Sequence, residues 1–431
     1  MASSSAGTTR EAEALAEIGR TLVLPGGARL LTGLLLGLLL GGAAAEFAAL
    51  RAGRPNLLHG DERLVFPARQ ELRDLWRDQG ALALAGRLRD ADVAAQDRIE
   101  RDSQLAGLVR PPLQSLLATR LRFGNSQVLI GAQGWLFFRD DFDYLTGPPF
   151  LAPSALARRA GGSSRHPSSA PDPLPALLGL AADLRARAIG FVLVPGPTKL
   201  GITWERFLGR RERAGPALSN PSRDELLVRL RRAGVDVLDP TPILRAMELR
   251  GEQPYMHFDS HWSPAGLDRV AAELAVLLRG RFELGEPERF HRHQRPFERY
   301  ADLADLLGLA PETNPYRIEP LQIEPVDGPG LQPFSSRRGG GRVLLVGDSF
   351  SRILIRNRRK GGDANFAAQL AFHLQRPVEM LAENDAGADF ARRVKWLRQP
   401  HKLDGRSVVV FEIAERAFAL GDWTSERLGP P

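Results

Sequence analysis

The chain has 431 residues, of which 43% are hydrophobic and 25% charged, as is typical of a globular protein with one large domain or two smaller ones. It contains no cysteine, which excludes disulfides, thiolate metal sites and cysteine nucleophiles. The formal net charge of +7 arises from basic residues that are interspersed with acidic ones, which argues against dedicated nucleic-acid binding.

The first segment with a structural signal is predicted to be a membrane anchor. Residues 1–21 are mostly small and polar and are expected to form a cytoplasmic tail, whereas residues 30–45 carry no charge. A helix over residues 30–45 is about 24 Å long at ~1.5 Å per residue, which suffices for a thin bilayer. We therefore expect an uncleaved transmembrane signal anchor within residues 22–50. A signal peptide cleaved after residues 43–45 is the alternative, and a buried core helix is disfavoured because the segment is apolar on every side.

Residues 51–120 are predicted to form a helical stalk or collar. Opposite charges recur at helical spacing in residues 71–76 and 97–101, which favours solvent-exposed helices. Nothing in this region points to a chemical function. Residues 121–431 are expected to form one large domain, in which residues 152–175, rich in Ser, Pro, Ala and Arg, are interpreted as a mobile loop.

This large domain alternates between predicted strands and predicted helices. Short apolar runs typical of buried strands occupy residues 191–195, 235–238, 343–347, 378–381 and 407–411. Helical patterns occupy residues 177–188, 224–232, 263–278 and 366–374. This alternation predicts an α/β fold with a doubly wound, mostly parallel sheet.

Ser349 is the candidate nucleophile. An unbroken run of Val and Leu residues leads into Gly347-Asp348-Ser349, so the serine is expected at the carboxyl edge of the sheet, where open α/β folds bind ligands. Alone, this motif is a weak signal, because Asp and Ser also cap helices.

Asp259 and His261 are the candidate partners of this serine. Residues two apart in an extended segment point the same way, so both side chains are expected to enter one cleft. A histidine base takes the serine proton, while a carboxylate fixes its tautomer and steadies the imidazolium. Alone, His261 is better explained as a capping or core histidine beside the helix start at Ser263. Together with Ser349, the three residues predict a Ser-His-Asp acyl-transfer catalyst.

Five short blocks, in order along the chain, resemble the alginate O-acetyltransferases of the AlgJ/AlgX type. The resemblance runs from about residue 131 to residue 423. The blocks are Gly134-Trp135-Leu136-Phe137, Pro195-Gly196-Pro197-Thr198-Lys199, residues 258–266, residues 347–351, and Glu412 with Glu415-Arg416.

The resemblance implies an SGNH-hydrolase-like domain with a permuted motif order, because Asp and His precede the serine. By position, Ser349 is the implied nucleophile, His261 the base and Asp259 its orienter. Asn384 resembles an SGNH asparagine block and is an oxyanion candidate beside the Ser349 N–H group, with a plain turn residue as the alternative. Arg392 is a substrate-contact candidate, with simple solvent exposure as the alternative. No metal and no cofactor is implied.

The implied activity is the transfer of an acetyl group, through an acetyl-serine intermediate, onto hydroxyls of a cell-surface or exported polysaccharide. Two alternatives stay open. One is a polysaccharide O-acetyl esterase with the same triad, and the other is a catalytically silent subunit of an exopolysaccharide assembly complex. The glycan itself is not specified by the sequence.

The implied partner is a multi-spanning membrane-bound O-acyltransferase that donates the acetyl group. The catalytic domain is expected to be tethered to the inner membrane by its N-terminal helix and to lie in the periplasm. Acetyl-CoA is not available in the periplasm. The sequence also has no Gly-rich phosphate cradle of the P-loop or dinucleotide type. We therefore expect a second protein to supply acetyl and a polysaccharide to accept it.

Overall fold

The structure is a computed structural model, and it describes residues 25–52, a few positions between 70 and 88, and residues 104–161, 168–210, 214–336, 341–355, 362–383 and 390–429. The predicted cytoplasmic tail, most of the predicted stalk and Asn384 lie outside the described residues. The chain divides into two compact units, Met1–Pro111 and Pro112–Pro431.

In the first unit, helix α2 (Pro25–Arg51) covers the segment predicted to be a membrane anchor. Among the residues that the structure describes, no helix combines the length and the apolarity needed to cross a membrane. Helix α4 (Gln104–Leu116) begins near the end of this unit and runs into a π-helical turn, η1 (Leu117–Leu121).

The second unit is built on a five-stranded sheet with the order β10-β9-β11-β3-β4. Every neighbouring pair in it is parallel, as the sequence predicted. The strands are β3 (Gly190–Gly196), β4 (Asp236–Val237), β9 (Val343–Gly347), β10 (Val378–Ala382) and β11 (Val408–Ala414).

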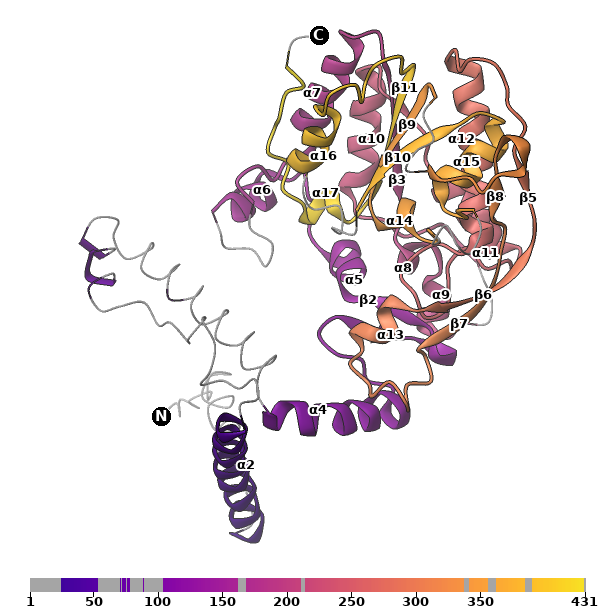
Figure 1. Cartoon of the computed structure of the whole chain (residues 1–431). Helices are drawn as coiled ribbons and strands as arrows, with labels where there is room; N and C mark the ends of the chain where they lie inside the picture. Colours follow the sequence, from indigo (N-terminus) through magenta and orange to yellow (C-terminus); the bar gives the residue numbers. More distant parts are fainter. Residues whose placement is uncertain are drawn as a thin grey trace, which may run out of the picture. The chain divides into compact units, whose positions relative to one another are not determined.

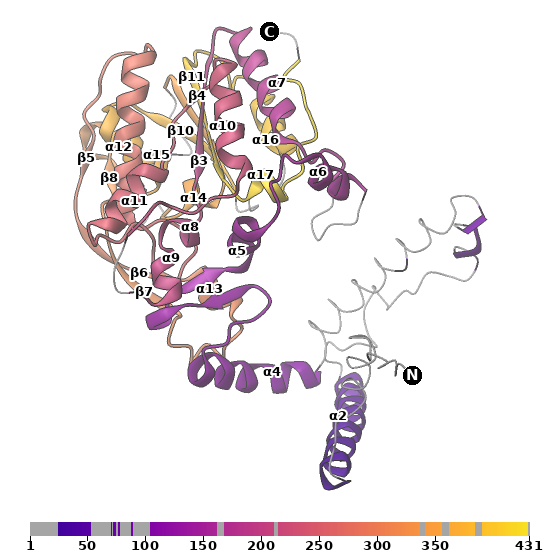
Figure 2. The ribbon, with the colours of Figure 1, turned by 180° about the vertical axis from the view of Figure 1, so that it is seen from behind.

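Helices cover both faces of this sheet (Figures 1 and 2). Val192 and Val194 of β3 belong to the core on one face, and Phe191 and Leu193 belong to the core on the other, because successive strand residues point to opposite sides. The first core contains α11 (Thr241–Leu249), α12 (Pro264–Arg281) and α15 (Phe366–Leu374), and the second contains α7 (Pro173–Arg185), α10 (Ser222–Arg232) and α16 (Phe390–Leu397). The predicted doubly wound α/β fold is thereby confirmed.

Smaller elements surround the carboxyl edge of the sheet. Two antiparallel hairpin-like pairs are β1 (Val128–Ile130) with β2 (Leu136–Phe138), and β6 (Arg295–Tyr300) with β7 (Ile318–Ile323). A third short pair joins β5 (His291–Arg292) to β8 (Val326–Asp327). The short helices are α5 (Arg139–Thr146), α8 (Lys199–Ile202), α9 (Trp204–Leu208), α13 (Asp302–Leu306), α14 (Ser349–Arg352) and α17 (Ala417–Leu420), with 3-10 turns η2 (Ala132–Gly134) and η3 (Pro329–Leu331).

The interpretation of residues 152–175 as a loop is wrong over much of its length. Helix α6 (Pro153–Ala160) occupies its first part, and Pro153 at the first helical position suits a helix start. The buried Arg159 donates to the carbonyls of Pro171 and Gly421, at 3.0 Å and 2.5 Å, and so fixes α6 to the chain after α17. These bonds depend on residues distant in sequence, which a composition argument does not detect.

Candidate active site

Ser349 lies in a sharp turn at the carboxyl end of the buried strand β9. It is the first residue of α14, and Asp348 caps that helix by accepting the Phe350 N–H at 2.9 Å. The second Asp348 oxygen accepts the Ala414 N–H of β11 at 2.8 Å, which ties the turn to the neighbouring strand. A Cβ on Gly347 would lie 2.2 Å from Ser351 Oγ, so only glycine permits this close turn. The serine itself is half-buried.

A buried polar network supports the turn from below. Glu412 Oε2 accepts the Asp348 N–H at 3.2 Å and the Ser351 hydroxyl at 2.7 Å. The Arg393 guanidinium donates to the Glu412 carbonyl at 2.9 Å and lies 3.6 Å from Asp348. Burial, together with the Asp348 charge, raises the pKa of Glu412 well above its ordinary value, which favours the protonated acid.

Asp259 and His261 form a hydrogen-bonded pair in a loop before α12. Asp259 Oδ1 lies 2.6 Å from His261 Nδ1 and also accepts the His261 backbone N–H at 3.1 Å. The prediction that this segment is extended is wrong. Residues 257–261 form bends between Tyr255 and Trp262, which pair as an isolated antiparallel bridge. The pairing therefore arises from a turn in which the aspartate folds back onto its own backbone.

The loop that carries Asp259 and His261 contacts the turn that carries Ser349. Trp262 Nε1 donates to the Phe350 carbonyl at 3.0 Å, and the His261 ring lies 4.7 Å from the Phe350 ring. The structure therefore brings the Asp259–His261 pair beside the residue that follows Ser349. The buried Nε2 of His261 has no hydrogen-bond partner among the described residues. Catalytic hydrogen bonds often tighten only when substrate is bound, so this geometry is compatible with proton transfer from Ser349.

Two further charged residues surround Asp259 and His261, and motif reasoning missed both. Arg299 of β6 donates to Asp259 Oδ2 at 2.8 Å. Asp302 of α13 donates its backbone N–H to the same oxygen at 3.2 Å, and its carboxylate lies 3.5 Å from His261 Nδ1. The carboxylate also accepts the N–H of Ser260 at 2.8 Å. Neither residue lies in a recognisable motif, because both reach the site by folding of the β6–α13 connection.

The electrostatics separate the pKa values of the pair. Burial alone raises the pKa of Asp259, but the charge and hydrogen bonds of His261 and the charge of Arg299 outweigh it, so the net pKa is lowered. Burial lowers the pKa of His261, but the charges of Asp259 and Asp302 outweigh it, and the net pKa is raised. An ionised aspartate beside a basic imidazole is the arrangement that general-base catalysis requires.

Of the other two candidates, the structure describes only Arg392. Asn384 lies outside the described residues. Arg392 is on α16, where its Nη1 lies 3.0 Å from Glu383 Oε2, and both side chains are about half exposed. Since Glu383 directly follows β10, which pairs with β9, Arg392 is held at the same edge of the sheet as Ser349.

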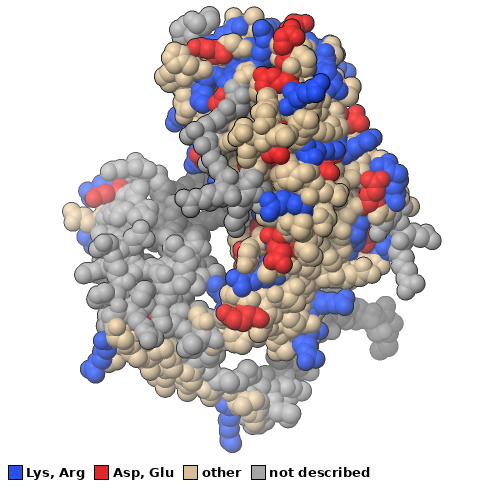
Figure 3. All heavy atoms as spheres, turned by 45° about the vertical axis from the view of Figure 1, so that its right-hand side comes forward, with Lys and Arg blue, Asp and Glu red and all other residues tan. Residues whose placement is uncertain are grey.

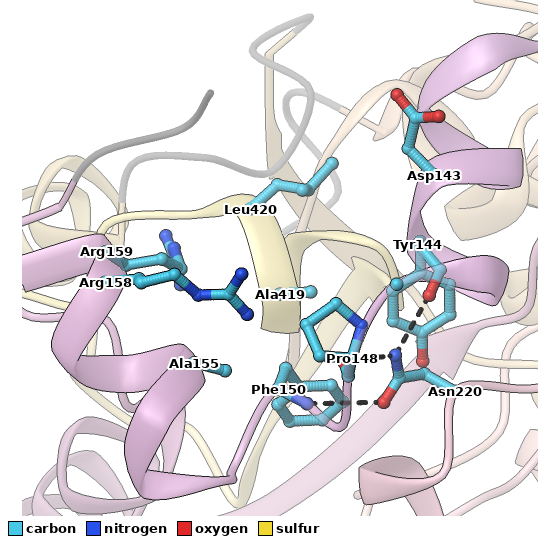
Figure 4. Close-up of a pocket in the computed structure, with 11 residues that line it drawn as sticks. Asp143, Tyr144, Pro148, Phe150, Ala155, Arg158, Arg159, Asn220, Ala419 and Leu420 are labelled. Carbon is cyan, nitrogen blue, oxygen red and sulfur yellow. Dashed lines mark hydrogen bonds between the residues drawn. The ribbon is translucent and has the colours of Figure 1, made fainter. Parts of the chain in front are cut away.

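Arg416 links the Ser349 turn to helix α5. Its buried guanidinium lies 3.1 Å from Asp141 and 5.7 Å from the Phe350 ring centroid. Beyond α5, a cavity of about 270 Å³ lies between α5, α6 and α17 (Figure 4). Its walls include Tyr144 and Phe150, and Arg158 lies at its α6 side. None of the four site candidates that the structure describes lines this cavity.

Charged side chains of both signs are interspersed on the face of the molecule seen in Figure 3. This face has mixed charge rather than a field of one sign.

Comparisons with known proteins agree with this fold and with the order of the sequence blocks. A family model described as "SGNH hydrolase-like domain, acetyltransferase AlgX" matches residues 128–415. The chain is similar to the probable alginate O-acetylase AlgJ of Pseudomonas aeruginosa, with 28% identity over 252 residues, which cover 53% of this chain and 56% of that protein. The chain therefore matches little more than half the length of that relative.

Among solved structures, the O-acetyltransferase domain of Pseudomonas putida AlgJ is similar to this chain, with a TM-score of 0.51 and 21% sequence identity. The similarity covers 69% of this chain and 93% of that domain, and it supports the fold. Because the family model spans more than half of the chain, this protein belongs to the family of SGNH hydrolase-like domains of the acetyltransferase AlgX.

Proposed function

We propose that this protein transfers acetyl groups onto hydroxyls of an exported polysaccharide through an acetyl-Ser349 intermediate. The observation that carries the proposal is the buried Asp259–His261 pair, at 2.6 Å, held beside the Ser349 turn by the Trp262–Phe350 hydrogen bond. Family membership and the relatives' names support acetyl transfer to a polysaccharide as the broad class of reaction.

The reaction has two balanced steps. First, His261 Nε2 accepts the Ser349 hydroxyl proton while Ser349 Oγ attacks the acetyl carbonyl, and the leaving group of the donor departs with that proton. Second, a sugar hydroxyl attacks the acetyl-serine ester while His261 accepts its proton, and the proton returns to Ser349 Oγ. Asp259 remains ionised throughout and orients the imidazole. The Ser349 N–H and Asn384 are proposed to stabilise the oxyanion, and Arg392 to contact the acceptor.

The proposal is tested by incubating the purified chain with an activated acetyl ester, with and without candidate glycans. Transfer to a glycan is expected from the wild-type chain, and none from Ser349→Ala, with the exposed Ser425→Ala as the matched control. Release of acetate at the same rate with every glycan would identify an esterase instead. Acetylation that is equally fast with Ser349→Ala would identify a different nucleophile, and a chain that never forms acetyl-enzyme would indicate a non-catalytic subunit.

The acetyl donor is proposed to be a membrane-bound O-acyltransferase, with Ser349 as the terminal carrier on the periplasmic side. A hydrolase would need no such partner. Deleting the partner acyltransferase is expected to leave the glycan unacetylated although this protein is present and folded. Direct use of acetyl-CoA by the isolated chain at a useful rate would contradict the relay.

A further inference from the structure

Lys199 is a fully buried lysine that the proposed reaction does not use. It is the first residue of α8, three positions after the end of β3. Its Nζ lies 5.0 Å from the ring centroid of Trp135 and 5.1 Å from that of Phe137. Nζ donates to three backbone carbonyls: those of Leu136 at 2.5 Å, His257 at 2.9 Å and Asp259 at 3.0 Å. A protonated amine has three N–H donors, so these bonds use its full capacity.

Glu319 of β7 binds the same stretch of backbone through the opposite groups. Its Oε1 accepts the His257 N–H at 2.6 Å, and its Oε2 accepts the Phe258 N–H at 2.9 Å. Lys199 and Glu319 are here called the backbone clamp. Lys199 binds the carbonyls of His257 and Asp259, and Glu319 binds the N–H groups of His257 and Phe258. Both side chains are buried, so neither bonding set exchanges freely with water.

One of the groups that the clamp binds belongs to the catalytic pair itself. The carbonyl bound by Lys199 belongs to Asp259, whose carboxylate orients His261. Residues 257–261 form bends and not a strand, so no continuous sheet ladder fixes their backbone. Two single backbone bonds hold it besides the clamp: the Leu136 N–H of β2 donates to the His257 carbonyl at 3.1 Å, and the Met256 N–H donates to the His261 carbonyl at 3.1 Å. A displacement of about 1 Å at a catalytic group can cost on the order of 100-fold in rate, which makes such anchoring consequential.

We propose that Lys199 and Glu319 are positioning residues that hold the Asp259–His261 pair in its productive geometry by binding the backbone of residues 257–259. This inference rests on the proposed function, since it takes His261 to be the base. It concerns how the base is held and leaves the identity of the glycan aside.

The protonation state of Lys199 gives the clamp a measurable signature. Burial lowers the pKa of Lys199 to about 8, and neighbouring carboxylates oppose this only in part. As the pH rises through about 8, the amine becomes neutral, keeps two N–H donors and can no longer donate to all three carbonyls. The charged and titratable groups around Lys199 are Glu319 on β7, Asp259 and His257 on the bound loop, Asp302 on α13, Asp141 on α5, and Arg206, which stacks on Trp135 from α9.

The experiment follows the rate of acetyl-enzyme formation on the full chain across the neutral and alkaline range, corrected for spontaneous ester hydrolysis. In the wild type, the rate is expected to fall with an apparent pKa of about 8. In Lys199→Arg the guanidinium stays charged, so the alkaline fall is expected to disappear. Lys199→Met is expected to slow acylation by about 100-fold with little change in KM. The matched control is Lys395→Met at an exposed position of α16.

Several results would overturn the clamp. They are a wild-type rate that is flat through pH values near 8, a Lys199→Arg variant that keeps the wild-type alkaline fall, or a folded Lys199→Met variant with the wild-type rate. If neither variant folds, the wild-type profile decides, since a fall near 8 supports the clamp and a flat profile rejects it. A wild-type chain that never acetylates Ser349 would reject the proposed function itself. A chain that acetylates Ser349 with no dependence on Lys199 would reject the clamp alone.

Discussion

Two carboxylates lie near the same ring nitrogen of His261, and their charges set the pH range in which the imidazole can act as a base. Asp259 contacts Nδ1 at 2.6 Å and Asp302 lies 3.5 Å from the same atom. The net effect is a raised His261 pKa, despite burial that acts in the opposite direction. Since the neutral imidazole is the active form, the raised pKa places the acidic limb of activity at a higher pH than an isolated histidine would.

Removing the Asp302 charge is expected to lower the His261 pKa. In Asp302→Asn, the acidic limb of the acylation rate should therefore move to lower pH, because less negative charge stabilises the imidazolium. Asp305→Asn, on the exposed side of the same helix α13, is the matched control and should leave the limb in place. An unchanged limb in a folded Asp302→Asn variant would show that Asp302 has no electrostatic role at His261.

Removing the base is expected to cost more than neutralising its orienter. His261→Ala deletes the proton acceptor, whereas Asp259→Asn keeps a side chain that Arg299 and the loop still hold. Both variants should slow acetyl-enzyme formation by at least ~100-fold, with His261→Ala the slower. Pre-steady-state rates measured at one pH would test this order, and a larger loss in Asp259→Asn would contradict it.

At the scale of elements, the β9–α14 turn depends on a buried acid that is proposed to be neutral. The pKa of Glu412 is raised in the folded chain above its ordinary value of about 4.5. The protonated side chain therefore stabilises the fold fully at pH values below about 4.5, and this stabilisation is lost as the pH rises through the pKa of the folded state. Glutamine mimics the protonated acid. The free energy of unfolding of Glu412→Gln should therefore lie within about 1 kcal/mol of the wild-type value at neutral pH.

The matched comparison is Glu412→Ala. This change leaves the Asp348 N–H and the Ser351 hydroxyl without their acceptor, and should lower the free energy of unfolding by about 1–3 kcal/mol or more. Urea unfolding of the full chain measures both values. Equal losses in the two variants would mean that the ionised carboxylate is needed under the turn.

At the scale of the whole molecule, the sequence predicted the fold well but the site only in part. Strand and helix patterns suffice for the parallel sheet, since each reflects local burial. The nearness of Asp259 and His261 was predictable from their spacing, although the supposed extended geometry was wrong. Arg299, Asp302 and Glu319 were missed because they arrive from β6, α13 and β7, and tertiary contacts of this kind leave no periodic signal. Lys199 lies in a sequence block that resembles the family, but its three carbonyl contacts depend on the tertiary structure and could not be predicted from that block.

The predicted membrane topology is a separate matter for experiment. If residues beyond position 50 are periplasmic, a reporter fused after residue 431 should be active when it requires export and silent when it requires the cytoplasm. A reporter active only in the cytoplasm would contradict both the localisation and the acetyl relay. A fusion of the same reporter after residue 21 is the matched control and should give the opposite pattern.

The most direct test of the account is to locate the acetyl group on the protein. The full chain is mixed with an activated acetyl ester, quenched within one turnover and digested for peptide mass spectrometry. The account predicts acetyl on Ser349, formed fast in the wild type, at least ~100-fold slower in His261→Ala and absent from Ser349→Ala. Acetyl found on another residue, or turnover that continues without any acetyl on Ser349, would contradict it.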